Sequence, residues 1–218
     1  LQPVVDALKD EMLVHRVLHA DETPVFMLDP GADKTHRAYL WSYSIGAFEP
    51  TKAVIYGFAE SRACRHAQEF LGDWRGTLIR NDCSGYKTLL ANGLTEAGCM
   101  AHARRKFFYL HSQKQRLRRW VALTHYLHYL SDGQVPIYNN WIENRIRPIA
   151  MGRKNWLFTG SLRAGKRAAA IMSLIQSAKL NGHAPFLYLK DILSRLPTQP
   201  KSRIGELLLH RWLPDASA

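Results

Sequence analysis

The pattern of hydrophobic and polar positions predicts a first part rich in strands and a second part made of helices. Residues 1–18 carry apolar side chains at helical spacing, at Val4, Leu8 and Met12, and predict a short amphipathic helix. Strand patterns then follow, separated by turn residues, at 19–28, 37–45, 52–59, 76–82 and 97–102, with helices predicted at 61–74 and 85–93. This order predicts a mixed α/β sheet rather than a pure βαβ repeat.

From residue 104 onward the hydrophobic pattern is helical. Apolar side chains keep helical spacing over 117–127, and the stretch "SDGQVP" at 131–136 ends that pattern. A second amphipathic helix is predicted around 168–175, and a last one begins at Pro185. With 218 residues, the chain is long enough for one sizeable core.

Charge changes this picture more than composition does. Thirty Lys and Arg stand against eighteen Asp and Glu, a net charge of +12 that favours a nucleic-acid partner over a merely basic protein. The three cysteines are too few and scattered for a disulfide framework, which indicates a reducing cytosol. There is no apolar run of membrane-spanning length, and the start at Leu1 without Met suggests a fragment of a longer protein.

Three acids are candidates for chemistry. Taken singly, Asp21 in "HADETP" and Asp82 in "RNDCSGY" look like turn residues, and Glu143 looks like the partner of Asn140 in a capping box. Taken together, two acids lie at the ends of separate strands and the third lies on the first turn of a later helix. Carboxylates so placed can converge at a sheet edge and bind two Mg²⁺ ions, as in two-metal phosphoryl transfer.

Several motifs carry a family resemblance. "HADETPV", "YLWSY", "ND-SGY" before "C-AHARRKFF", and "NN--EN-IRP-A-GRKNWLF-GS" resemble the transposases of the insertion-sequence 66 family, from about His19 to Leu196. These are Asp-Asp-Glu transposases with a ribonuclease H-like core. The resemblance implies a mixed five-stranded sheet flanked by helices, with a helical C-terminal segment. It also implies that Asp21, Asp82 and Glu143 are catalytic, and that they hold two Mg²⁺ ions for which Mn²⁺ can substitute.

The same resemblance implies an organisation and a function. We expect a lead-in helix at 1–18, a catalytic core at 19–181 with a shortened helical insertion at 104–136, and a C-terminal helix and tail at 182–218. The implied reaction is phosphodiester hydrolysis at transposon ends, followed by strand transfer into target DNA. Implied partners are both DNAs, a second copy of the chain and accessory proteins of the element, in the bacterial cytoplasm and without a membrane. The alternative is a catalytically inactive, transposase-derived DNA-binding protein.

Two short motifs beside the acids have competing interpretations. "CMAH" contains Cys99 and His102 at the spacing of a zinc half-site, but no second pair matches it in sequence. The resemblance suggests instead that His102 supports the active site by hydrogen bonding. Asn139 and Asn140 could each cap the following helix or contact substrate, and capping is favoured for Asn140.

Basic residues form the remaining pattern. No acid occurs from 97 to 131, where seven Lys and Arg lie, so phosphate contact is favoured over a merely solvated helix face. "GSLRAGKR" at 160–167 nearly matches a nucleotide-binding loop, but Arg167 replaces the required hydroxyl residue, which favours a grip on DNA phosphate over nucleotide hydrolysis. The predicted DNA-binding residues are Arg104, Arg105, Lys106, Arg147, Arg153, Lys154, Asn155 and Lys166.

Overall fold

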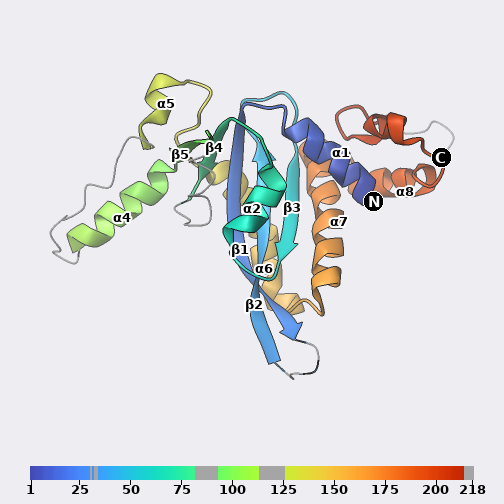
Figure 1. The fold of residues 1–218 in the computed structure, drawn as a ribbon, viewed down its shortest axis with the longest axis horizontal. Coiled ribbons are helices and arrows are strands. Elements are labelled where there is room, and N and C mark those ends of the chain that lie inside the picture. Colours follow the sequence, from blue (N-terminus) through green and yellow to red (C-terminus); the bar gives the residue numbers. More distant parts are fainter. Residues whose placement is uncertain (30, 32–33, 82–92, 113–125, 214–218) are drawn as a thin grey trace.

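A central β-sheet with helices on both sides organises the described part of the chain (Figure 1). The computed structural model describes residues 1–29, 31, 34–81, 93–112 and 126–213. The strands are β1 (Val17–Asp29), β2 (Lys34–Ile45), β3 (Val54–Ala59), β4 (Thr77–Arg80) and β5 (Thr95–Gly98). The helices are α1 (Gln2–Met12), α2 (Cys64–Leu71), α4 (Met100–Ser112), α5 (His128–Ser131), α6 (Asn140–Trp156), α7 (Leu162–Leu180) and α8 (Pro185–Arg195), followed by the 3-10 helix η3 (Lys201–Leu207).

The strand order β3-β2-β1-β4-β5 identifies the fold class. β1, β2 and β3 form an antiparallel meander, and β4 and β5 then run parallel to β1 on its other side. β3 and β4 lie on opposite sides of β1 and β2 in this order, and the connection through α2 carries the chain across those two strands. The predicted mixed sheet flanked by helices is confirmed, and its order is that of a ribonuclease H-like fold.

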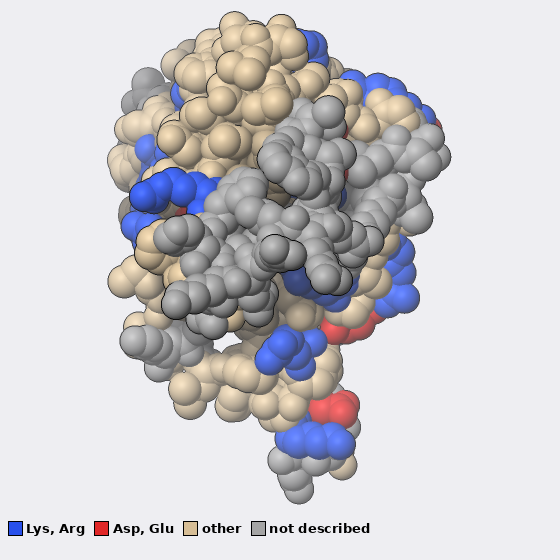
Figure 2. All heavy atoms as spheres, turned by 90° about the vertical axis from the view of Figure 1, so that its left-hand side faces the viewer, with Lys and Arg blue, Asp and Glu red and all other residues tan. Residues whose placement is uncertain are grey.

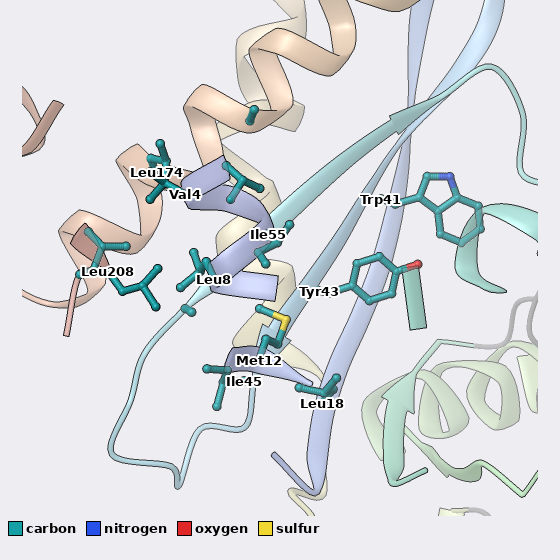
Figure 3. Close-up of a cluster of buried hydrophobic side chains, with 14 of the residues drawn as sticks. Val4, Leu8, Met12, Leu18, Trp41, Tyr43, Ile45, Ile55, Leu174 and Leu208 are labelled. Carbon is teal, nitrogen blue, oxygen red and sulfur yellow. The ribbon is translucent and has the colours of Figure 1, made fainter. Parts of the chain in front are cut away.

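Helix α1 covers one face of the sheet, and the larger apolar core lies between them (Figure 3). Val4, Leu8 and Met12 lie on one side of α1, as their spacing predicts, and all three are buried. Leu174 from α7 and Leu208 from the C-terminal segment join the same cluster. The C-terminal part of the chain therefore completes a core that the first helix begins.

The opposite face is covered by α6. Ile142, Ile146 and Ile149 recur at helical spacing and pack against Val25 and Phe58 from the sheet. This packing holds the first turn of α6 over β1, which matters for the candidate site.

Helix α7 lies along the outer strand β3 and protects its edge. Ser173 Oγ accepts a hydrogen bond from the Tyr56 N–H at 2.8 Å, and Ser177 Oγ accepts one from the Val54 N–H at 2.9 Å. Ser177 also donates to the Val54 carbonyl. Side chains thus satisfy backbone groups that an edge strand leaves open for other chains.

Some predicted boundaries were wrong. The fifth strand is Thr95–Gly98 rather than 97–102, and α4 already begins at Met100, because a short apolar run suits either element. The lead-in helix ends at Met12, and β1 starts at Val17. The helices predicted at 85–93 and 117–127 lie almost wholly outside the described residues. No helix in the described ranges has the length and apolar character needed to span a membrane.

Candidate active site

Adjacent residues of β1 face opposite sides of the sheet, and this alternation separates Asp21 from its neighbour Glu22. His19 faces α6, since its Nδ1 lies 2.8 Å from Oδ1 of Asn139, one residue before that helix. Asp21 is two residues further along and faces the same way. Glu22 faces the opposite side, where it pairs with Arg62 ahead of α2.

Asp21 lies where the pairing between β1 and β4 ends. The last matched pair is Ala20 with Arg80, so β4 ends beside Asp21. Asn81, the next residue after β4, donates from Nδ2 to Asp21 Oδ1 at 3.3 Å. Asp82 follows directly in sequence and lies outside the described residues. The predicted convergence of all three acids is therefore untested at Asp82.

The carboxylate of Asp21 is in an environment that disfavours its charge. Burial, followed by the negative charges of Glu22 and Glu143, raises the pKa of Asp21 to about 7. Hydrogen bonds from the Glu22 N–H, at 3.0 Å, and from Asn81 oppose this rise. Glu143 of α6 therefore lies close enough to Asp21 for its negative charge to raise the pKa of Asp21.

Glu143 lies on the first turn of α6. The backbone carbonyl of Asn139 accepts hydrogen bonds from the N–H groups of Ile142 and Glu143, both at 3.2 Å. Asn139 therefore occupies the cap position, and the helix begins at Asn140, which is exposed. Capping by Asn140 was thus misplaced by one residue. The Glu143 carboxylate lies beside a histidine, with Oε1 3.5 Å from His102 Nδ1.

Asn139 is the residue that sequence reasoning undervalued. It is fully buried, its Nδ2 donates to the Ala20 carbonyl at 3.0 Å, and its Oδ1 accepts from His19 Nδ1. Burial lowers the pKa of His19 to about 4, so its ring is neutral near pH 7. The Asn139 N–H donates a hydrogen bond to Cys99 Sγ, with the nitrogen 3.2 Å from the sulfur. One amide residue thus connects β1, the start of α6 and the segment after β5.

Cys99 and His102 lie on either side of the start of α4, which follows β5. Cys99 is buried, and His102 lies on the first turn of α4. Their ligand atoms and one oxygen of Glu143 all lie within 4.8 Å of one another. The predicted position of His102 next to the active site is compatible with this arrangement.

Trp141, which flanks Glu143 in sequence, has a structural role. Its indole N–H lies 3.0 Å from Ser44 Oγ and 3.1 Å from the Ile45 carbonyl, at the end of β2. The cations of Lys52 and Arg145 lie over its ring at 5.3 Å and 4.4 Å. The tryptophan therefore anchors α6 to the sheet.

The predicted DNA-binding residues fall into three groups. Arg104 and Arg105 of α4, and Arg147 and Asn155 of α6, are exposed, and Lys and Arg atoms lie on the face of Figure 2. The side chains of Lys106, Arg153 and Lys154 lie outside the described residues.

Lys166 forms the third group. It belongs to α7, which lies along β3, two strands away from β1. There Lys166 lines a cavity of about 690 Å³ between α7, α1 and the β3 side of the sheet. Its neighbour Gly165 has a packing role, since a Cβ there would lie 2.2 Å from the Phe58 ring. The structure therefore does not bring Lys166 together with Asp21 and Glu143.

A ribonuclease H-like fold with two neighbouring acids, Asp21 and Glu143, is typical of enzymes that cut nucleic acids. The family follows from comparison with known protein families. The model of the Transposase IS66 family matches residues 1–123 and 113–167, and that of the IS66 C-terminal element matches 173–208. The chain belongs to the IS66 transposase family. The first model matches in two pieces that meet at 113–123, where the shortened insertion was predicted.

Curated relatives come from Sinorhizobium fredii. The chain is 25% identical to the uncharacterized protein y4hP over 308 residues, covering all of this chain and 54% of that protein. It is 27% identical to y4jD over 297 residues and 28% to y4qI over 294, covering 99% of this chain and 57% and 54% of those proteins. The chain spans about half the length of these relatives. The alignment with y4hP is 90 residues longer than this chain.

Proposed function

We propose that this chain is the catalytic core of a DNA transposase, in which Asp21, Asp82 and Glu143 hold two Mg²⁺ ions, or Mn²⁺ in their place. The reaction would be phosphodiester hydrolysis at transposon ends and strand transfer into target DNA. The observation that carries the proposal is the partly buried position of Asp21 beside two other acids. A half-buried carboxylate with its pKa raised by burial and by two neighbouring acids is stabilised by a bound divalent cation.

The residues present fit such ions. Mg²⁺ prefers oxygen ligands, and the acids of β1 and α6 supply carboxylates at the point where β4 leaves the sheet. When bound, two ions activate an attacking oxygen and stabilise a leaving one. The chain itself orients the ligands. Asn81 donates to Asp21, and Asn139 holds the first turn of α6 against β1.

The excess of positive charge would hold the DNA. Arg104, Arg105 and Arg147 are exposed on α4 and α6, the helices that contribute His102 and Glu143. We propose that they contact phosphates together with Asn155 and with Lys106, Arg153 and Lys154. Lys166 would contact DNA further away, along β3. Such contacts would supply affinity and salt dependence rather than sequence choice.

The wider context also remains a proposal. From the family we propose that the chain acts in the cytoplasm, with a second copy of the chain on DNA and with accessory proteins of the element. We also propose a division into a catalytic core at 19–181 and a C-terminal part at 182–218.

A nicking assay tests the function. Supercoiled DNA carrying the transposon ends is incubated with the chain in Mg²⁺, Mn²⁺ or chelator. We expect metal-dependent nicking that Asp21→Asn and Asp82→Asn each abolish. Glu22→Gln is the matched control, because it alters the adjacent acid on the opposite face and should retain nicking.

Equal nicking by wild type and Asp21→Asn would refute the metal assignment. DNA binding without nicking in any metal would favour the alternative, a catalytically inactive, transposase-derived DNA-binding protein.

A further inference from the structure

Cys99, His102 and Glu143 form a second group of metal-ligating atoms beside the proposed Mg²⁺ ligands. They come from the end of β5, the first turn of α4 and the first turn of α6. In sequence Cys99 and His102 are a half-site without a partner. The fold adds the carboxylate of Glu143, which lies 41 residues after His102 in the sequence, and this third ligand makes the group a candidate metal centre.

We propose that these three side chains bind one borderline divalent transition-metal ion of the Zn²⁺ class, with solvent completing its coordination. Thiolate and imidazole are ligands that Zn²⁺ accepts and that Mg²⁺ avoids. The site would therefore select a different metal from the oxygen ligands of Asp21 and Asp82.

The separations suit this ion. Zn–S bonds of about 2.3 Å and Zn–N and Zn–O bonds of about 2.0–2.1 Å keep tetrahedral ligand atoms roughly 3.3–3.6 Å apart. His102 Nδ1 and Glu143 Oε1 are already 3.5 Å apart, and all three ligand atoms lie within 4.8 Å. His102 and Glu143 are partly exposed, so small side-chain rotations can close the remaining gap.

The charge and the surroundings also suit it. A thiolate and a carboxylate carry two negative charges, which balance a divalent cation while the imidazole stays neutral. The backbone N–H of Asn139 points at Cys99 Sγ from 3.2 Å, and the N-terminus of α4 begins at the next residue. Both features stabilise a negatively charged sulfur.

Glu143 would belong to both metal centres, and this consequence rests on the proposed function. A Zn²⁺ ion held by Cys99 and His102 would engage the carboxylate that the Mg²⁺ ions require. Zn²⁺ should therefore inhibit nicking, and it should do so through Cys99.

Cobalt substitution tests the site without relying on activity. The whole chain is reduced, stripped with chelator and titrated with Co²⁺, followed by Zn²⁺. We expect a sulfur-to-cobalt charge-transfer band that saturates at one equivalent and disappears as Zn²⁺ replaces Co²⁺. Cys99→Ser should remove the band, and His102→Gln and Glu143→Gln should weaken binding about tenfold or more.

Two controls separate this site from others. Cys64→Ser alters a cysteine of α2 outside the cluster and should keep the band. Asp21→Asn should also keep it, so that failure of the Mg²⁺ proposal leaves this result readable. The absence of a band in wild type, or a band that survives Cys99→Ser, would overturn the proposal. If Cys99→Ser does not fold by circular dichroism, unchanged binding by folded His102→Gln overturns it equally.

Discussion

The two faces of β1 show how one strand serves two purposes. On the face toward α1, Leu18 and Ala20 are fully buried among apolar side chains, and Glu22 is neutralised by Arg62. On the face toward α6, His19 and Asp21 lie among polar groups, and neither is paired with a group of opposite charge in the contacts described. Leu18 and Ala20 therefore contribute stability, whereas His19 and Asp21 are groups whose burial costs stability.

This contrast predicts which substitutions lower the stability of the fold and which abolish its function. Truncation on the α1 face removes apolar contacts and should destabilise the fold without altering metal binding. Removal of the Asp21 charge should stabilise the fold and abolish function, the trade-off expected of active sites.

Leu8→Ala should have the largest effect on stability. Leu8 is 1% exposed and lies in the core between α1 and the sheet, so truncation leaves a cavity. We expect the free energy of unfolding to fall by about 2–5 kcal/mol in urea titrations. The cobalt band per folded molecule should not change. A loss below about 1 kcal/mol would show that α1 contributes little to this core.

Asn139→Ala should come next. It leaves the Ala20 carbonyl and the His19 Nδ1–H buried without their partner, at a cost of about 2–3 kcal/mol. Asn140→Ala is the matched control on the neighbouring exposed residue, with an expected change within about 0.5 kcal/mol. Equal losses of unfolding free energy in the two variants would contradict the assignment of this supporting role to Asn139 rather than Asn140. Urea unfolding followed by circular dichroism measures both.

Asp21→Asn should stabilise the metal-free chain, and the gain should depend on pH. Because the pKa is raised from 3.8 to about 7 in the folded state, ionisation costs stability as pH rises through this range. The full shift corresponds to about 4 kcal/mol, and partial exposure reduces the expected gain at pH 8 to about 1–2 kcal/mol. The gain should vanish near pH 4. A gain independent of pH would contradict the assigned cause.

His19 should act in the same pH range with the opposite sign. Its pKa is lowered from 6.5 to about 4, so the folded state resists protonation and loses stability as pH falls from 6.5 toward 4. In wild type the two slopes oppose each other. Asp21→Asn should therefore show a clear loss of stability on acidification, which wild type shows weakly. Urea midpoints at half-unit pH steps measure this.

Glu22→Gln should have the smallest effect. The side chain of Arg62 is 49% exposed and that of Glu22 is 6% exposed, so their ion pair contributes about 1 kcal/mol at most. Nicking and cobalt binding should stay at the wild-type level. Loss of nicking in this variant would show that the two faces of β1 are not independent.

Much of the fold could be predicted from spacing. The period of α1, the strand predicted at 37–45 and the start of α8 at Pro185 are local properties, and the structure confirms them. The boundary between β5 and α4 was wrong, because a short apolar run fits a strand or a helix equally well. The choice between Asn139 and Asn140 failed for a similar reason, since both are good cap residues and burial separates them.

The order of most strands and helices, the positive charge and the candidate acids could be predicted from the sequence, because these depend on neighbouring residues and composition. Which residues come into contact depends on how the strands and helices pack. Asn139 reaches His19, Cys99 approaches Glu143, and Lys166 lies on a different part of the sheet. The first of these pairs is 120 residues apart along the chain and the second 44, and no local pattern encodes a contact that forms only when two elements pack.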